Sequence, residues 1–373
     1  MNKKEWIAEL NIDVKFLQPK KAQTSYKIQY IKEYVLYWLK VSVNRQEVKN
    51  INFIDCMCNA GIYEDGDLGT SMEVLQLFIE EAKSHPHINF YLYLNDIDKN
   101  RIYIIKQICN KILPYEINNI IITYKNSDVN DYLCDYSQFD LSLQYSASTI
   151  LFIDPYDMRS VNIEPIQHFI QHYYCEVFYN ILTNDFTRNK NDKEISSTLD
   201  TDKKFSSKDE LVHYISLQLK INKMKYCFSY PFNNVKNAEI YQILFITPNI
   251  RGLEKVKEAL RTVFKGMEKY RNKPQGPELE LFSLDDSNVE ENVLLNCGKE
   301  AQDYLCFKYS SQCVPYSKIN EFILENSVLA DNHIIKYILV PLIDKGVIIK
   351  CNKGVNKSNY KNDEYIFNEY NGC

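Results

Sequence analysis

Residues 51–63, INFIDCMCNAGIY, begin as a short apolar run, end that run at Asp55 and pass into a turn around Gly61. An apolar run of this length before a turn is typical of a buried strand in a parallel sheet. Two similar runs follow at 89–98 and 119–128, and each ends in an aspartate. Strands that alternate with helices predict βαβ units. The helix-like segments between the three runs lie at 72–82 and 99–112.

The chain continues this pattern toward a complete sheet. Residues 148–157 (STILFIDPYD) and 175–182 (CEVFYNIL) predict a fourth and a fifth strand. Residues 223–234 and 238–249 predict an antiparallel pair at one edge of the sheet, and the polar tract 187–209 before them predicts a loop or a small insertion. Seven strands of this kind predict an α/β fold with a doubly wound, Rossmann-like sheet.

The remaining segments suggest how the chain divides. Apolar residues within 23–43 recur at three- and four-residue spacings, so 1–50 is predicted to be a helical region that packs on the sheet domain, 51–272. The composition shifts at 273–295, which we interpret as a linker. Residues 296–373 read as three helices followed by a β-hairpin. This is the element order of a winged-helix domain.

Composition limits the possible classes of protein. The 373 residues are 45% hydrophobic and 25% charged, which is typical of globular chains. No apolar stretch is long enough for a membrane span or a secretory signal, so we expect a cytoplasmic protein with no membrane partner. The eleven cysteines are scattered and odd in number, which favours free thiols, and no metal site is predicted. The net charge of -5 disfavours a chain that coats nucleic acid, although 345–361 holds five lysines and no acid.

Four aspartates follow the first four predicted strands, at Asp55, Asp96, Asp128 and Asp154. Ligands of open α/β sheets bind at the carboxyl ends of the strands. A carboxylate after the second strand is placed to accept hydrogen bonds from a ribose diol, and a polar residue after the third can meet an adenine edge. The pattern therefore predicts an adenosine-containing cofactor. The structural alternative is that each aspartate caps a helix or opens a turn.

The tripeptide Asp154-Pro155-Tyr156 suggests the reaction. A D/N-P-P-Y/F turn in amino-methyltransferases aims polar oxygens at an exocyclic or amide nitrogen, while its aromatic residue stacks on a flat substrate. Such a turn suits a base held out of its stack. This chain has one proline in the turn where that motif has two.

The ordered motifs resemble those of the three-Cys-motif partner proteins (TcmP), over roughly residues 20–270. DCMCNAGIY keeps the family's Asp55, Gly61 and Tyr63, and FIDPYD matches its strand-four motif. Cys56 and Asn59 stand where the family has glycines. Further matching positions are Lys27, Tyr30, Ile31, Gly69, Thr70, Ser71, Asn180, Asn184, Asp185, Arg188, Arg251, Gly252, Leu253, Glu254 and Lys255.

The resemblance implies a class I S-adenosylmethionine-dependent methyltransferase-like fold with S-adenosylmethionine as its cofactor. It also implies a separately encoded three-Cys-motif partner that resembles radical-SAM enzymes. The catalytic residues are then predicted to be Asp154, Pro155 and Tyr156. The predicted cofactor-binding residues are Asp55, Asn59, Gly61, Tyr63, Asp96 and Asp128.

Two functions from different classes follow from these observations. The first is a methyltransferase-like protein acting on nucleic acid (DNA or RNA), whose winged helix contacts phosphates through Lys350, Lys353 and Lys357. The second is a catalytically inactive methyltransferase-fold protein that binds nucleic acid or a partner protein. A metal-dependent nuclease built on Asp154 and Asp185 is disfavoured, because no second acidic pair is evident.

Overall fold

The computed structural model describes residues 4–143, 146–189, 193–234, 236–271, 286–351 and 360–369. The chain forms two compact units, Met1–Gly252 and Leu253–Cys373. The boundary between them falls inside helix α11 (Ile250–Phe264). None of the helices within the described ranges has the length and apolar character needed to cross a membrane.

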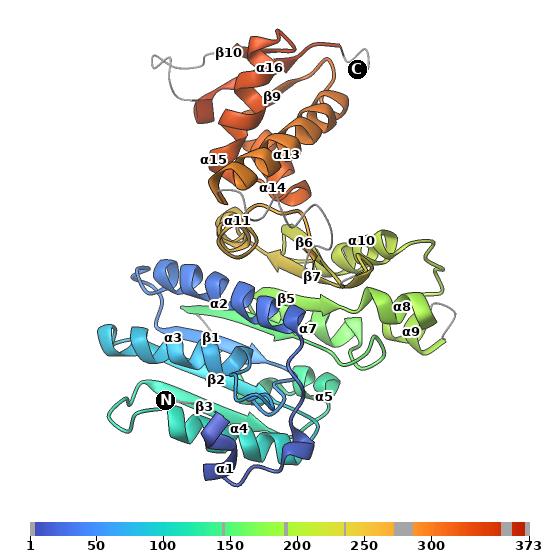
Figure 1. Ribbon diagram of the computed structural model, residues 1–373. Coiled ribbons are helices and arrows are strands. Elements are labelled where there is room, and N and C mark those ends of the chain that lie inside the picture. The colour runs from blue at the N-terminus through green and yellow to red at the C-terminus, as the bar shows by residue number, and fades with distance from the viewer. Residues whose placement is uncertain are drawn as a thin grey trace. The chain divides into compact units, whose positions relative to one another are not determined.

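The first unit is built on a mostly parallel sheet (Figure 1). Its strands run in the order β3-β2-β1-β4-β5-β7-β6, with β1 to β5 parallel and β7 antiparallel to both of its neighbours. This confirms the predicted doubly wound, Rossmann-like sheet with a hairpin near one edge. The strands are β1 (Asn50–Asp55), β2 (Asn89–Asn95), β3 (Ile120–Lys125), β4 (Ala147–Ile153), β5 (Glu176–Ile181), β6 (Tyr226–Asn233) and β7 (Glu239–Thr247).

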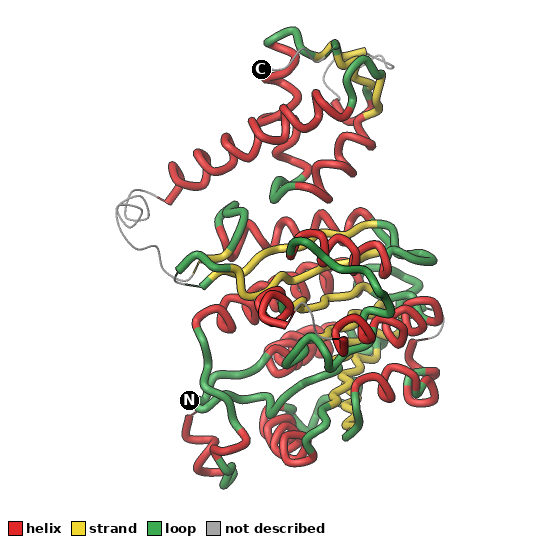
Figure 2. Tube along the Cα trace, turned by 90° about the vertical axis from the view of Figure 1, so that its right-hand side faces the viewer, coloured by secondary structure: helices red, strands yellow, loops and turns green. Residues whose placement is uncertain are grey.

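Helices cover both faces of this sheet (Figure 2). One row contains α2 (Ala22–Ser42), α3 (Thr70–Ser84) and α4 (Lys99–Ile112), and the other contains α5 (Val129–Cys134), α7 (Ile163–His172) and α10 (Lys208–Leu219). Because both faces are covered, every residue of β5 and all but the first of β1 are buried. The shorter elements are α1 (Lys4–Glu9), η1 (Val14–Phe16), η2 (Tyr136–Gln138), α6 (Asp140–Leu143), α8 (Thr183–Asn189) and α9 (Lys193–Thr198).

Of the two predicted alternatives for the polar tract 187–209, the structure agrees with a small insertion. It contains the end of α8, the whole of α9 and the start of α10. Ser207 caps α10 by accepting a hydrogen bond from the Glu210 amide, and Phe205 is buried in the core. A few apolar residues thus anchor a segment whose average composition is polar. Helix α10 continues beyond the tract and carries buried residues at helical spacing.

The second unit combines helices with a small antiparallel sheet of order β10-β11-β9. The predicted helices and hairpin are present, and β9 is an additional strand. The predicted linker 273–295 is helical from Asp286 on, while 272–285 lies outside the described residues. The elements are β8 (Tyr270–Arg271), α13 (Asp286–Lys308), β9 (Cys313–Pro315), α14 (Tyr316–Asn326), α15 (Asp331–Ile334), η3 (Ile335–Leu339), α16 (Val340–Asp344), β10 (Ile348–Cys351), η4 (Tyr360–Asn362) and β11 (Glu364–Phe367).

The predicted third helix of this unit is interrupted by the π-helical turn η3. Pro341 lies just after this turn, and a proline inside a helix lacks the N–H that would bond the carbonyl of Tyr337. That carbonyl instead accepts a hydrogen bond of 2.8 Å from the Gln302 side chain. The interruption therefore has an identifiable cause and leaves a satisfied backbone.

Candidate active site

A cavity of about 250 Å³ opens at the carboxyl ends of β1, β4 and β5. It lies where the strand order reverses, because the chain passes from β1 to β2 on one side and from β4 to β5 on the other. The cavity brings together seven of the predicted site residues. These are Asp55, Asn59, Gly61, Tyr63, Asp154, Pro155 and Tyr156.

The turn after β1 has the conformation that a glycine-rich loop requires. Gly61 has a φ of +73°, and a Cβ atom there would lie 2.7 Å from Cγ1 of Ile105. Asn59 has a φ of 56°, and its Oδ1 accepts a hydrogen bond from the Ala60 amide. Asparagine tolerates this region of the backbone map, so it can replace a glycine here. Cys56 is fully buried in the core and does not line the cavity.

Asp55 is buried at the end of β1, with an exposed fraction of 2%. Ser71 donates a hydrogen bond to its Oδ2, and the Met57 amide donates one of 3.2 Å to its Oδ1. Burial raises the pKa of the Asp55 carboxyl to about 7, and the charges of Asp154 and Asp96 add to this shift. The floor of the cavity therefore holds a carboxyl group that titrates near neutral pH.

We expect the stability of the protein to fall as the pH rises from about 4 to about 7, with Asp55 as one cause. In this range the unfolded chain carries Asp55 ionised, at its ordinary pKa of 3.8, while the folded chain keeps it protonated. Asp55→Asn cannot ionise. Urea unfolding at about pH 5 and about pH 8 should show the variant losing about 2–3 kcal/mol less stability than the wild type. An equal loss would mean that Asp55 is ionised throughout.

Asp154 is held by two side chains from distant parts of the chain. Lys27 of α2 donates to Oδ2 at 2.5 Å, and Asn180 of β5 donates to Oδ1 at 2.7 Å. All three residues line the cavity. Lys27 and Asn180 were only matching positions in the family resemblance, which gave them no role. Their contact with Asp154 was not visible in the sequence, because Lys27 precedes Asp154 by 127 residues.

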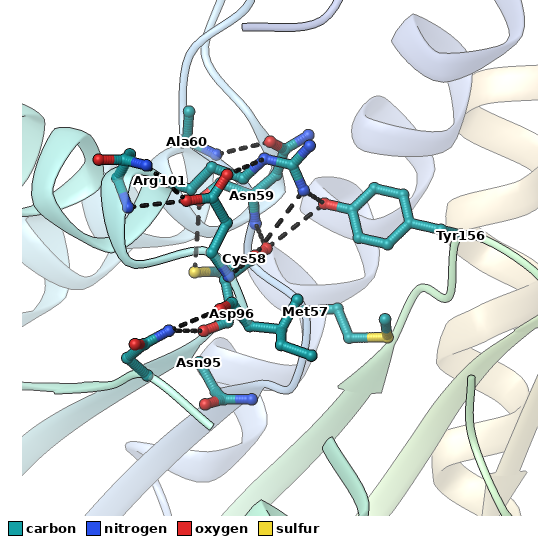
Figure 3. Close-up of polar contacts among 12 residues, drawn as sticks. Met57, Cys58, Asn59, Ala60, Asn95, Asp96, Arg101 and Tyr156 are labelled. Atoms are coloured by element: carbon teal, nitrogen blue, oxygen red, sulfur yellow. Dashed lines mark hydrogen bonds and ion pairs between the residues drawn. The ribbon is translucent and has the colours of Figure 1, made fainter. Parts of the chain in front are cut away.

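Tyr156 reaches toward the residues that follow β2 (Figure 3). Its hydroxyl accepts a hydrogen bond of 2.5 Å from Arg101 and donates one of 3.3 Å to Oδ2 of Asp96. The Arg101 guanidinium also lies 5.0 Å from the centre of the Tyr156 ring. The side chain that was predicted to stack on a substrate is therefore tethered to Asp96 and Arg101.

Asp96 and Asp128 differ in what they contact. Asp96 is 1% exposed and accepts hydrogen bonds from the amides of Asn59 and Asp98 as well as from Tyr156. It joins the turn after β1 to the end of β2 without lining the cavity itself. Asp128 caps α5 by accepting from the Asn130 amide, and the structure does not bring it to the cavity. Capping was the structural alternative for each aspartate.

The lysines that were predicted to contact nucleic acid belong to the second unit. Lys350 forms an ion pair of 2.9 Å with Asp363 and lies 3.9 Å from the centre of the Tyr360 ring. Its side chain is only 14% exposed, so its ammonium group is directed into the second unit and not toward a ligand in solvent. Lys353 and Lys357 lie outside the described residues.

No protein-family model matches the chain, and no curated protein matches it. Solved structures that align with it include methyltransferases. Trm1 from Pyrococcus horikoshii with S-adenosyl-L-methionine is 11% identical, with a TM-score of 0.36 over 66% of this chain and 62% of that chain. The methyltransferase domain of bacterial CtHen1 is 9% identical, with a TM-score of 0.33 over 58% of this chain and 99% of that domain.

A type I restriction-modification methyltransferase subunit from Streptococcus thermophilus is also similar. It is 9% identical, with a TM-score of 0.30 over 62% of this chain and 44% of that chain. The present chain thus spans about three fifths of the Trm1 structure and less than half of the Streptococcus subunit. At identities near 10%, the function has to be inferred from the chain's own residues.

Proposed function

We propose that the first unit binds S-adenosylmethionine in the cavity at the ends of β1 and β4 and transfers its methyl group to a nitrogen of a nucleic acid. The observation that carries this proposal is the meeting of two motifs in one cavity. The tight turn around Gly61 and the tripeptide Asp154-Pro155-Tyr156 come from different strands and line the same space. That space lies at the position where open α/β sheets bind their ligands.

The residues present fit this cofactor. A Cβ atom at Gly61 would collide with Ile105 and Met72, so glycine lets the turn pack tightly on α3 and α4 while it lines the cavity. Asp55, which stays protonated up to about pH 7, and Asp154, which is paired with Lys27, place hydrogen-bond acceptors beside the cavity for amino groups of the ligand. Asp96 does not line the cavity, so it would hold the ribose diol once the Tyr156 hydroxyl has left it. When bound, S-adenosylmethionine supplies an electrophilic methyl group.

Asp154 is the residue that we assign to the acceptor nitrogen. Each of its two carboxylate oxygens accepts one hydrogen bond from the protein, which leaves lone pairs for an N–H of the substrate. Because Lys27 and Asn180 fix the carboxylate, its acceptor direction is set before the substrate arrives. Tyr156 would then stack on the ring of the substrate once its hydroxyl has left Asp96.

We expect Tyr156→Phe to tighten the binding of S-adenosylmethionine by about tenfold. The variant keeps the ring but loses the hydroxyl that competes with the ribose for Asp96, a charged acceptor. Titration calorimetry on the wild type and the variant measures this difference. Tyr115→Phe is the matched control, since that side chain is 96% exposed. Unchanged or weaker binding in Tyr156→Phe would show that the hydroxyl does not occupy the ribose position.

The second unit is proposed to be a winged-helix domain that binds the nucleic acid. Its helices and its antiparallel sheet of three strands support this proposal. In the sequence, Lys353, Lys357 and Lys361 fall between β10 and β11, where they add positive charge.

Replacing both Lys353 and Lys357 by glutamine should flatten the salt dependence of nucleic-acid binding by about two phosphate contacts. The slope of the logarithm of the binding constant against the logarithm of the salt concentration measures this effect. Lys350→Gln is the matched control, because Lys350 is paired with Asp363, and it should leave the slope unchanged. An unaltered slope in the double variant would instead favour a protein-binding role for the domain.

The inactive alternative also has a specific observation in its favour. Tyr156 and Arg101 already contact Asp96, the residue proposed to hold the ribose. Methyl-tritiated S-adenosylmethionine, incubated with mixed-sequence single-stranded DNA and RNA, distinguishes the two functions. Tritium in the nucleic acid supports the transferase, and saturable cofactor binding without incorporation supports an inactive binding subunit. The three-Cys-motif partner is proposed from the family resemblance and would be added to the same assay.

A further inference from the structure

A buried lysine lies directly beside the carboxylate that we assign to the acceptor nitrogen. Lys27 is 8% exposed, its Nζ is 2.5 Å from Oδ2 of Asp154, and it lies 5.6 Å from the centre of the Tyr241 ring. An ammonium group in such a place is costly unless it is paired, and removing its partner leaves an uncompensated charge. Lys27 and Asp154 therefore have to be considered as one charge-neutral pair.

The geometry excludes a common use of lysine in proteins that bind nucleic acid. A lysine that binds phosphate presents an open ammonium group to the ligand. The ammonium of Lys27 is directed at Asp154, and its side chain is 9% exposed, against 25% for that of Asp154. The carboxylate is thus the more accessible member of the pair. Lys27 acts on a ligand in this cavity through Asp154.

We propose, on the basis of the methyl transfer proposed above, that Lys27 is a positioning residue that neutralises Asp154. The acceptor end of the cavity then takes an uncharged N–H nucleophile, such as the exocyclic amino group of a base, and discriminates against an alkylammonium group. An unpaired aspartate would bind an alkylammonium and stabilise its protonated form, which has no lone pair. Lys27 supplies the positive charge that such a substrate would otherwise bring.

The reaction balances for an uncharged acceptor. The acceptor nitrogen uses its lone pair to form the new N–C bond, while the electron pair of the broken S–C bond stays on sulfur. One proton then leaves the methylated nitrogen for water. An alkylammonium would have to lose a proton before the same step, against the attraction of an unpaired Asp154. The neutral pair removes this attraction and keeps the hydrogen-bond acceptor in place.

Two cofactor analogues test this inference without a known substrate. S-adenosylhomocysteine has no group at the position of the transferred methyl, whereas sinefungin carries a protonated amine there. The full chain is titrated with each ligand, and the ratio of the two dissociation constants is compared between variants. Lys27→Met should favour sinefungin over S-adenosylhomocysteine by about tenfold relative to the wild type, since Asp154 is then unpaired. Lys27→Arg keeps the charge and should preserve the wild-type ratio.

A second variant keeps the test decisive if Lys27→Met does not fold. Asp154→Asn leaves the lysine cation without its partner and should disfavour sinefungin by about tenfold relative to the wild type. The double variant Lys27→Met, Asp154→Asn carries neither charge and should restore the wild-type ratio.

Each outcome has one meaning. If both ligands bind to Lys27→Met and Asp154→Asn with the wild-type ratio of dissociation constants, Lys27 is only a structural residue and this inference is overturned. Equal weakening of both ligands has the same meaning, because it leaves the ratio unchanged. The proposed cofactor site would survive that result. If neither ligand titrates into the wild type, the proposed function fails, and the inference fails with it.

Discussion

Replacing Asp154 by alanine is expected to lower methyl transfer to nucleic acid by about three orders of magnitude while changing the dissociation constant of S-adenosylhomocysteine, which carries no charge at sulfur, less than about threefold. Asp154 accepts hydrogen bonds from Lys27 and Asn180 and faces the cavity. Its proposed role is to hold the acceptor nitrogen, which matters for the transfer and little for the cofactor. Single-turnover assays and calorimetry measure the two effects separately.

The loss of Asp154 also leaves Lys27 buried without a partner, which is expected to cost about 3–5 kcal/mol of stability. The double variant Lys27→Met, Asp154→Ala removes this charge and is the matched control. It should unfold at a higher temperature than Asp154→Ala and still fail to transfer the methyl group. If Asp154→Ala retains wild-type activity per folded molecule, Asp154 is a structural residue and the catalytic assignment is wrong.

The second large effect is expected from Gly61→Ala, which should weaken the binding of S-adenosylmethionine by more than about 100-fold and destabilise the protein by about 2–4 kcal/mol. An alanine at a φ of +73° is strained, and its Cβ would lie 2.7 Å from Cγ1 of the fully buried Ile105. The turn has to move, and the cofactor loop moves with it. Urea unfolding measures the loss of stability, and calorimetry measures the loss of affinity for S-adenosylmethionine.

Gly346→Ala separates the two causes. Gly346 has a similar φ of +67°, but no atom lies within 4 Å of the place of its Cβ. This variant should show the backbone strain alone, about 1 kcal/mol, with unchanged cofactor binding. A cost for Gly61→Ala no larger than that for Gly346→Ala would mean that the turn after β1 does not need the space that Ile105 fills.

Much of the sheet could be predicted, because apolar runs that end in Asp55, Asp96, Asp128 and Asp154 recur at βαβ spacing. The helix predicted at 99–112 matches α4 to the residue. Parallel strands meet at one edge of the sheet, so the prediction that Asp55 and Asp154 share a site followed from topology alone. The sequence did not decide between a loop and a small insertion at 187–209, because the polar composition of that tract conceals the buried Ile195 and Phe205.

The side-chain contacts within the site could not be predicted from the sequence, and the reason is physical. Periodicity shows which face of an element is buried, but it does not pair a lysine of α2 with an aspartate after β4. Nor does it show that Arg101 turns the Tyr156 hydroxyl toward Asp96. Asp128 caps α5 in the structure. An aspartate at the end of a strand can hold a ligand or cap a helix, and the sequence alone does not distinguish the two roles.

The most direct test of the central claim is a calorimetric titration of S-adenosylmethionine into the full wild-type chain. We predict saturable binding of one equivalent, which S-adenosylhomocysteine competes away and Gly61→Ala abolishes. No heat of binding and no displacement, at cofactor concentrations up to about 1 mM, would contradict the claim that the cavity between the ends of β1 and β4 is a cofactor site.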